Sequence, residues 1–371
     1  MKVVFLLSGL GSGGLENYLF RFLNYCNRSN LKLQTTIICR GDLNKEDSIL
    51  SDKFRSLGVK IKYMPMKSFS IIKHFQLANY LRKQQFDTLC DFSGYLSGFV
   101  ILIAYFLKIN TRVASYRESR FQFKPTAAKR VFVAISKVLI NFFATKILSN
   151  SKDALLFFHP KSQNNKKFKI IDNAINIPQE NNFDNNQFRS LHNIPTNAFL
   201  IGHVGRFSHA KNHNMIAKFI NRINKLDTSV HFVLCGKGVR DGMINLGYEL
   251  SNVHYIEYSQ SLGDFYHSLD FFYFPSLNEG QPNVLLEAMS IGIPFIASNI
   301  PSIKEIVPKS AWSFLVDPGD ISSCLSIFKN YQNDNLLFPS ADVSKYISTK
   351  YGSHKNFELF YDELDGSKND E

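Results

Sequence analysis

The sequence has 371 residues, which is enough for two domains of ordinary size. Its hydrophobic share of 44% and aromatic share of 14% exclude a disordered chain, and its five cysteines, without a C-x-x-C pair, argue against a disulfide framework and for a reducing cytoplasm. The net charge of +12 is uneven: residues 1–190 carry 29 Lys and Arg against 12 Asp and Glu, and residues 191–371 carry 14 against 19. This asymmetry indicates an anionic partner for the first half, either a membrane or a nucleic acid.

The first half alternates short apolar or β-branched runs with helical patterns. The apolar run at 3–7 stops at Ser8, too early for a signal peptide, so it is predicted to be a buried first strand. Further strands are predicted at 34–39, 60–63, 88–91 and 112–115. Residues 99–107 are predicted to form a buried helix, because no apolar window reaches the roughly 18 residues of a membrane-spanning helix. Strands that alternate with helices imply a parallel sheet with crossover connections.

The same alternation begins again after a polar stretch at 161–190, which is predicted to be an interdomain connection around one strand at 168–171. Strands are then predicted at 199–204, 231–234, 254–256, 271–274 and 294–297. The predicted fold class is therefore α/β, with two Rossmann-like, doubly wound domains. We expect these domains to face each other across a cleft at the carboxyl ends of both sheets, where ligands of such folds bind.

A glycine-rich stretch follows the first predicted strand. Residues 9–14 match G-x-G-x-x-G between a strand and a helix, and Arg40 follows the second strand, so one hypothesis is an NADP-dependent oxidoreductase. A strand–helix turn without a ligand would give the same pattern. Nothing else in the chain resembles a hydride-transfer site, so this motif does not decide the function.

The most specific stretch is P-S-L-N-E-G-Q-P-N-V-L-L-E-A-M at 275–289, directly after a predicted strand. Pro282 suits the first position of a helix, and the N-terminus of that helix suits a phosphate. Glu287 lies further along the helix, and a carboxylate with two acceptor oxygens suits a vicinal diol such as that of ribose. Glu279 precedes the helix, where a transferred group would sit. Two carboxylates at this spacing are also common on solvated helix faces.

Taken as a whole, this string resembles the E-x7-E signature of family 4 glycosyltransferases, which have the GT-B fold. The segment G-R-F-S-H-A-K at 205–211 resembles the family's G-R-x-x-x-x-K element, whose Arg and Lys hold the donor diphosphate. Two fixed cations at a helix start can neutralise a leaving diphosphate without a metal. The run G-G-L-E at 13–16 resembles a family loop that approaches donor and acceptor. The resemblance thus implies catalytic roles for Arg206, Lys211 and Glu279, and donor binding by Gly13, Gly14, Gly280, Gln281, Asn283, Val284 and Glu287.

The sequence departs from the family's pattern at one place. Many members carry a His near the sugar after the strand that corresponds to 112–115, whereas this chain reads A-S-Y-R-E-S at 114–119. Some relatives carry an S-x-R pattern there, so Arg117 is assigned the sugar-side catalytic role. An exposed loop cation is the alternative interpretation of Arg117.

The resemblance covers essentially the full chain and implies its organisation. An acceptor-side domain is expected at 1–175 and a donor-binding domain at 176–349, with a final helix at 350–366 that crosses back onto the first. The implied enzyme is a retaining hexosyl- or N-acetylhexosaminyltransferase that takes a nucleotide sugar, UDP in preference to GDP, and needs neither metal nor cofactor. The lack of a D-x-D triplet agrees with this. A nucleotide-sugar epimerase of the same fold is a further alternative, but it would need acid and base groups beyond Glu279.

A basic apolar segment at 123–146 indicates what kind of acceptor to expect. Its apolar residues are surrounded by four cations, Lys129, Arg130, Lys137 and Lys146. This pattern is typical of a membrane-surface helix, and equally of a core helix with a basic outer side. Relatives that build bacterial surface polysaccharides act on lipid-linked acceptors, so we expect a lipid-linked glycan acceptor and a cytoplasmic enzyme attached peripherally to the anionic inner face of the plasma membrane. No nucleic-acid partner is expected, because no helix-turn-helix, zinc module or RNP string is present.

Overall fold

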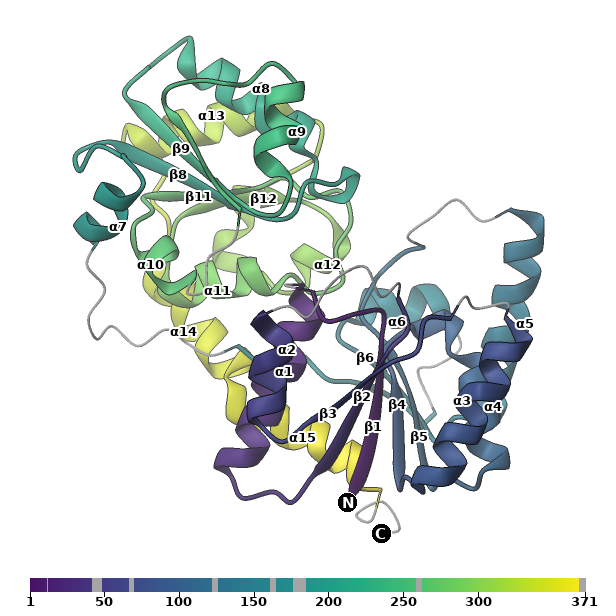
Figure 1. The fold of residues 1–371 in the computed structure, drawn as a ribbon. Coiled ribbons are helices and arrows are strands. Elements are labelled where there is room, and N and C mark those ends of the chain that lie inside the picture. The colour runs from purple at the N-terminus through teal and green to yellow at the C-terminus, as the bar shows by residue number, and fades with distance from the viewer. Residues whose placement is uncertain are drawn as a thin grey trace. The chain divides into compact units, whose positions relative to one another are not determined.

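The structure is a computed structural model, and it describes residues 1–11, 13–41, 49–66, 70–121, 126–160, 165–175, 185–257 and 262–366. The chain divides into two compact units (Figure 1). Unit 1 consists of Met1–Ala174 together with Ser353–Glu371, and unit 2 consists of Ile175–Gly352. Each unit is built on one parallel sheet, as the fold class predicted.

Unit 1 contains a seven-stranded sheet with the order β3-β2-β1-β4-β5-β6-β7. Its strands, in chain order, are β1 (Lys2–Leu7), β2 (Gln34–Cys39), β3 (Lys60–Tyr63), β4 (Thr88–Asp91), β5 (Thr111–Tyr116), β6 (Lys146–Ser149) and β7 (Phe168–Ile170). All neighbours run parallel, with Val4 of β1 opposite Leu89 of β4 in the register. The order reverses between β1 and β4, which is where doubly wound sheets bind ligands.

Two layers of helices cover the two faces of this sheet, because successive side chains of a strand point to opposite sides. Val3, Phe5 and Leu7 of β1 pack with α1 (Gly14–Arg28), α2 (Ile49–Ser56) and α15 (Ser353–Asp365). Val4 and Leu6 pack with the other layer, which is made of α3 (Ile71–Gln84), α4 (Gly98–Phe106) and α5 (Ala127–Phe143) (Figure 1). The short helices η1 (Gly94–Leu96) and α6 (Lys152–Phe158) complete the unit.

Unit 2 contains a six-stranded sheet with the order β10-β9-β8-β11-β12-β13. Its strands are β8 (Phe199–Val204), β9 (Val230–Cys235), β10 (Val253–Ile256), β11 (Phe271–Phe274), β12 (Phe295–Ser298) and β13 (Leu315–Val316). One face packs on α8 (His213–Asn224), α9 (Val239–Asn245) and α13 (Ile321–Gln332). The other packs on α7 (Asn185–Leu191), α10 (Leu262–His267), α11 (Asn283–Ile291) and α14 (Ser340–Tyr351). The remaining short helices are η2 (His209–Lys211), α12 (Pro301–Lys304) and η3 (Lys309–Phe314).

The structure corrects several local predictions. Pro282 lies one position before α11, as its N-cap, instead of at the first helical position. Lys146 does not belong to the basic helix: it begins β6 and pairs with Glu363 of α15 at 3.3 Å. The helix predicted as buried at 99–107 is α4, in which Phe106 is 72% exposed. The strands β6 and β13 were not predicted: β6 begins at Lys146, the last residue of the stretch interpreted as helical, and β13 has only two residues.

Candidate active site

The loops that follow β8 and β11 lie at the point where the strand order of unit 2 reverses. They are tied to each other by the backbone N–H of Leu277, which donates to the carbonyl of Ala210 at 2.8 Å. The Nζ of Lys211 donates to Oε1 of Glu279 at 2.6 Å. Both side chains are largely withdrawn from solvent, at 19% and 12% exposure. Two of the predicted catalytic residues, 68 positions apart, are thus brought together at the reversal where such sheets bind ligands.

Two glycines hold the cation of this pair in place. A Cβ on Gly205 would lie 3.1 Å from the stem of Lys211, so the lysine stem runs along the glycine backbone. Gly236, at the end of β9, has a φ of +155° and is packed against the backbone of Gly205, where no side chain fits. Phe207 N–H donates to the carbonyl of Lys237 at 3.0 Å, which joins the loops after β8 and β9. The lysine is therefore supported by a rigid backbone.

Asn212 is a site-building residue that the sequence analysis missed. It adopts a left-handed conformation with a φ of +57°, which Asn tolerates better than most residues. Its Nδ2 donates to the carbonyls of Pro275 and Pro318, at 3.1 and 3.0 Å. This one side chain therefore links the loops that follow β8, β11 and β13. The signal available in the sequence was an Asn directly after the G-R-F-S-H-A-K segment.

Four of the predicted donor-binding residues lie around the start of α11, whereas Gly13 and Gly14 belong to unit 1. Gly280, Gln281 and Asn283 are buried, and Val284 is half-buried. The N-cap residue is a proline, which supplies no side-chain hydrogen bond to the first turn. A helix N-terminus without its own cap suits an anionic oxygen.

Glu287 projects from α11 and is held by a tyrosine that the sequence did not indicate. The hydroxyl of Tyr266, a buried residue of α10, donates to Oε2 of Glu287 at 3.0 Å and approaches the carbonyl of Val284 at 3.1 Å. Because the two side chains are 21 residues apart, only the packing of α10 on α11 brings them together. The contact fixes the orientation of the Glu287 carboxylate.

Among the four predicted catalytic residues, only Arg206 is exposed. It follows Gly205 in the loop after β8, and it forms no ion pair within the ranges that the structure describes. Lys211, by contrast, is already paired and also lies 4.9 Å above the ring of Phe274. The site therefore offers one exposed cation and one that is held by a carboxylate.

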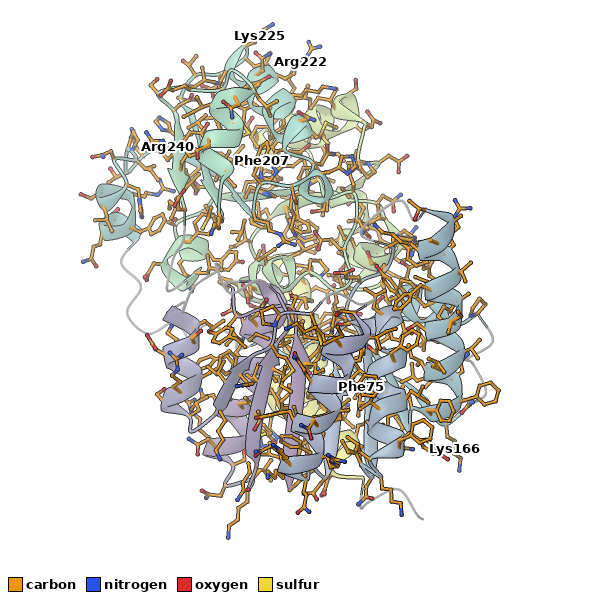
Figure 2. All side chains as sticks on the ribbon, turned by 45° about the vertical axis from the view of Figure 1, so that its right-hand side comes forward. Phe75, Lys166, Phe207, Arg222, Lys225 and Arg240 are labelled. Atoms are coloured by element: carbon orange, nitrogen blue, oxygen red, sulfur yellow. The ribbon has the colours of Figure 1, made fainter. Side chains whose placement is uncertain are left out.

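Two buried histidines lie close to the loop after β8. His203 lies at the end of β8, its Nδ1 2.9 Å from the carbonyl of Tyr273, and burial lowers its pKa well below the usual value. His213 begins α8, and burial lowers its pKa to about 4. The ring of Phe207, labelled in Figure 2, lies over His213 at 4.7 Å between centroids. Both imidazoles are neutral near pH 7, so they pack as uncharged side chains.

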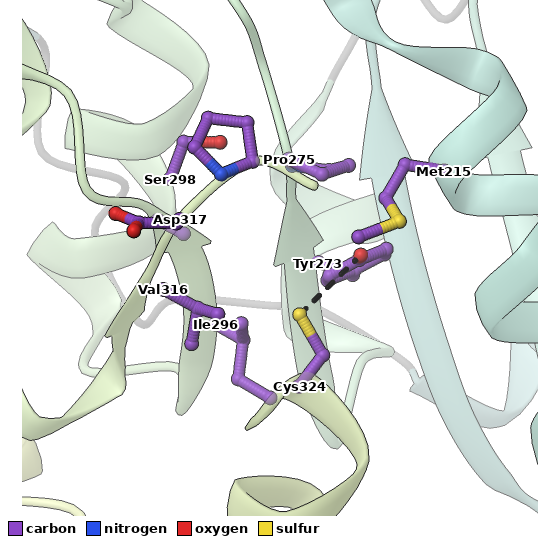
Figure 3. A pocket seen from close by; sticks show the side chains of 10 residues that line it. Met215, Tyr273, Pro275, Ile296, Ser298, Val316, Asp317 and Cys324 are labelled. Atoms are coloured by element: carbon purple, nitrogen blue, oxygen red, sulfur yellow. Dashed lines mark hydrogen bonds between the residues drawn. The ribbon is translucent and has the colours of Figure 1, made fainter. Parts of the chain in front are cut away.

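A narrow gap lies beside this site, among the carboxyl ends of β11, β12 and β13 (Figure 3). It is lined by Met215, Tyr273, Ser298 and Cys324, among others, and the Tyr273 hydroxyl lies 3.7 Å from the Cys324 sulfur. The gap has no room for a water molecule. We therefore assign the candidate site to the loops after β8 and β11 and not to this gap.

The glycine-rich loop of unit 1 follows β1, at the reversal of its own sheet. Gly13 is the N-cap of α1, and a Cβ there would collide with the carboxylate of Glu16, which folds back over it. Gly13 and Gly14 are exposed. Next to this loop, Arg40 donates to both carboxylate oxygens of the buried Asp91, at 2.8 and 3.2 Å. The residue that the oxidoreductase hypothesis assigned to an NADP phosphate is therefore engaged inside the protein.

Arg117 is held within unit 1 and is not an exposed loop cation. Its guanidinium lies 4.1 Å from the ring centroid of Tyr18, which is a cation–π distance. Nη1 donates to Oδ1 of Asn173 at 2.6 Å, and Nε donates to the hydroxyl of Ser115 at 3.3 Å. The structure therefore gives Arg117 a packing role, and its role beside the sugar remains a prediction.

The chain is similar to known glycosyltransferases in sequence and in fold. Residues 198–328, which contain the loops after β8 and β11, match the family described as Glycosyl transferases group 1. The chain is 26% identical over 318 residues to the capsular polysaccharide biosynthesis glycosyltransferase CapH of Staphylococcus aureus, covering 82% of this chain and 83% of that protein. It is 27% identical over 183 residues to the UDP-Gal:alpha-D-GlcNAc-diphosphoundecaprenol alpha-1,3-galactosyltransferase of Escherichia coli, covering 46% of each.

A solved structure matches the whole fold. Anabaena Alr3699/HepE, in complex with UDP and glucose, superposes with a TM-score of 0.77 at 16% identity, covering 98% of this chain and 99% of that one. The protein is accordingly a glycosyltransferase of the GT-B fold. The residues that match the group 1 family all lie in its second unit.

Proposed function

We propose that the protein is a retaining, metal-independent glycosyltransferase of family 4. It transfers a hexosyl or N-acetylhexosaminyl group from a nucleotide sugar, preferably UDP-linked, to a lipid-linked glycan in surface-polysaccharide biosynthesis. The observation that carries this proposal is the contact of Lys211 with Glu279 at the strand-order reversal of unit 2. The names of the relatives point the same way, because CapH is a capsular polysaccharide enzyme and the Escherichia coli relative uses UDP-Gal and a diphosphoundecaprenol acceptor.

The donor is proposed to bind along the loops after β8 and β11. Glu287 accepts hydrogen bonds from the ribose hydroxyls through the carboxylate that Tyr266 orients. The diphosphate is bound by Arg206, Lys211 and the N-terminus of α11. Gly280, Gln281, Asn283 and Val284 line the donor between these groups.

The transfer step needs no protein nucleophile. A bond forms between the acceptor hydroxyl oxygen and the anomeric carbon, while the bond from that carbon to the diphosphate oxygen breaks. The leaving phosphate takes the hydroxyl proton on the same face of the sugar, so the configuration is retained. Arg206 and Lys211 stabilise the charge that develops on the diphosphate, the role that a metal ion fills in other transferases. When donor binds, Glu279 shares Lys211 with the diphosphate and lies beside the sugar.

The acceptor and the location are proposed from unit 1. Its sequence carries most of the positive charge, and the outer side of α5 is exposed and basic. Within the described ranges, no helix combines the length and apolarity needed to cross a membrane. We therefore propose peripheral attachment to the anionic cytoplasmic face of the plasma membrane, where a lipid-linked acceptor is presented.

The experiment that tests the proposed function is a donor panel of UDP- and GDP-sugars with a lipid-linked acceptor and excess EDTA. Release of the nucleoside diphosphate and retention of the anomeric configuration in the product are measured. We expect turnover with a UDP-sugar that survives chelation. Turnover that EDTA abolishes and Mn²⁺ or Mg²⁺ restores would contradict the metal-free mechanism, and an inverted product would contradict the retaining one. Reduction or oxidation of NADP(H) would favour the oxidoreductase hypothesis.

A further inference from the structure

The helical layer of α3, α4 and α5 exposes an unusual number of large apolar side chains. They are Ile71, Ile72 and Phe75 of α3, Tyr105 and Phe106 of α4, and Val131, Ile135, Val138 and Phe142 of α5. Phe142 is 76% exposed and Phe75, labelled in Figure 2, is 73% exposed. The opposite layer of the same sheet, α1, α2 and α15, exposes only Leu359 among its described large apolar residues. The apolar exposure is therefore concentrated on one face of unit 1, which we call the α3–α5 face.

The helix α5 is apolar on two sides. Phe132, Val133 and Ile140 are buried against the rest of unit 1. The four exposed positions recur at intervals of four, three and four residues, which places them within about 60° of one another around a helix of roughly 3.6 residues per turn. They are Val131, Ile135, Val138 and Phe142. A core helix needs only the first side, so the second stripe is not required by the fold of unit 1.

The charge of the α3–α5 face has a single sign. The three helices contain no Asp or Glu, and their six cations are Lys73, Arg82, Lys83, Lys129, Arg130 and Lys137. The opposite layer carries acidic residues on each of its helices, among them Glu16, Asp52 and Glu358. On α5, Arg130 lies beside the exposed apolar stripe. A surface that is apolar and purely cationic complements one that is anionic with an apolar interior.

We infer that the α3–α5 face is the membrane-docking surface, and that its apolar side chains enter the headgroup region of an anionic bilayer. This deepens the proposed function, because it names the residues and adds a hydrophobic component to the binding. Charge attraction alone fades when the Debye length shrinks to roughly 3 Å at about 1 M salt. Apolar residues buried in the bilayer interface do not lose their contribution at high salt. Binding should therefore weaken with salt but persist.

The test is co-sedimentation of the full chain with phosphatidylcholine vesicles, with and without about 30% phosphatidylglycerol, at about 0.15 M and about 1 M salt. An apolar variant combines Ile135→Ser and Phe142→Ser, and a charge variant combines Arg130→Gln and Lys137→Gln. The matched control is Leu337→Ser, an equally exposed apolar residue of unit 2. These side chains, apart from the half-buried Lys137, are exposed, and a thermal melt of each variant checks that it folds.

We expect the native chain to bind anionic vesicles at both salt concentrations. The apolar variant should bind about tenfold more weakly at low salt and lose binding at high salt. The charge variant should lose the preference for anionic over neutral vesicles, and Leu337→Ser should bind like the native chain. Equal effects of the apolar variant and the control would overturn the inference. So would a self-associated native chain that Phe142→Ser converts to monomers without any vesicle binding, since the face would then be an interface between copies.

The outcome is independent of catalysis. With a water-soluble acceptor, the rate of nucleoside diphosphate release should be unchanged in the apolar and charge variants. Neither variant changes a residue in the loops after β8 and β11. Vesicle binding without turnover would leave the docking surface intact and remove the proposed function. Turnover without vesicle binding would contradict the docking surface and leave the enzymatic part of the proposed function intact.

Discussion

The two units of this glycosyltransferase share one architecture and differ in where they place their charges. Each sheet reverses its strand order once, and an ion pair lies at each reversal: Arg40 with Asp91 in unit 1, and Lys211 with Glu279 in unit 2. In unit 1 the carboxylate is fully buried and both its oxygens are used, so the pair is part of the scaffold. In unit 2 the carboxylate oxygen Oε1 holds a lysine beside the exposed Arg206.

The surfaces of the two units also differ in their charge. Cations are numerous on unit 1 and cover a helical layer that has no acidic residue. Unit 2 is acidic overall, and its candidate site has two cations: Lys211, which is packed against the Gly205 backbone, and the exposed Arg206. One architecture thus occurs with two distributions of charge. Under the proposed function, the dispersed charge of unit 1 attracts a surface, whereas the two cations of unit 2 stabilise a reaction.

The largest effect is expected from the cations of the unit 2 site. Lys211→Ala and Arg206→Ala should each lower kcat about 100- to 1000-fold, as the loss of one preorganised group at a developing negative charge does. Lys218→Ala, an exposed lysine of α8, is the control. Nucleoside diphosphate release is the measurement. A similar loss in Lys218→Ala would mean that the overall charge of unit 2 matters, not these two positions.

A smaller effect is expected from the carboxylate on α11. Glu287→Gln removes a charge-assisted hydrogen bond to the ribose, which costs about 1.5–3 kcal/mol, or at least tenfold in affinity. Calorimetric titration with UDP and with GDP measures it, with Glu249→Gln as a control on the same unit. Unchanged affinity for both nucleotides would exclude Glu287 from the site.

Tyr266→Phe should have a milder effect on donor binding, measured by steady-state kinetics. The substitution keeps the ring packed and removes only the hydroxyl that orients Glu287. We expect KM for the donor to rise a few-fold with little change in kcat, because the carboxylate that contacts the ribose is less well oriented but still present. In a Glu287→Gln background the added loss should shrink. An undiminished effect in that background would mean that Tyr266 acts through packing alone.

The smallest expected effect is a difference between the two units in how their stability depends on pH. Burial lowers the pKa of His203, of His213 to about 4 and of His254 to about 4, all in unit 2; in unit 1, His159 is similarly lowered to about 4. Below the unfolded value of about 6.5 the unfolded chain binds more protons than the folded one, so stability falls as pH falls toward 4. Unit 2 should therefore lose a few °C in Tm between pH 7.5 and pH 5.5, and more than unit 1. Calorimetry in which both transitions shift equally would contradict this difference.

The sequence predicted the architecture because strand and helix periods are local properties. The run at 3–7 and the strings at 205–211 and 275–289 carry their signal within a few residues, so the fold class and the Lys211 and Glu279 candidates could be found. Contacts that form only when helices and strands pack together could not be found from the sequence. Tyr266 meets Glu287 from 21 residues away, and Arg40 meets Asp91 from 51 residues away. The second apolar stripe of α5 was ambiguous, because spacing alone does not tell a buried face from an exposed one.

The position of the nucleotide site is tested most directly by a hydrogen-exchange footprint of the native chain with UDP and, separately, with NADP. If the donor binds in unit 2, UDP should protect amides at 205–212 and 275–287, around Lys211, Glu279 and Glu287, and NADP should protect nothing. Protection by NADP at residues 8–14 and 91–98 of unit 1, with none by UDP in unit 2, would contradict it. That result would mean that the nucleotide site lies in the glycine-rich loop of unit 1 and not at the loops after β8 and β11.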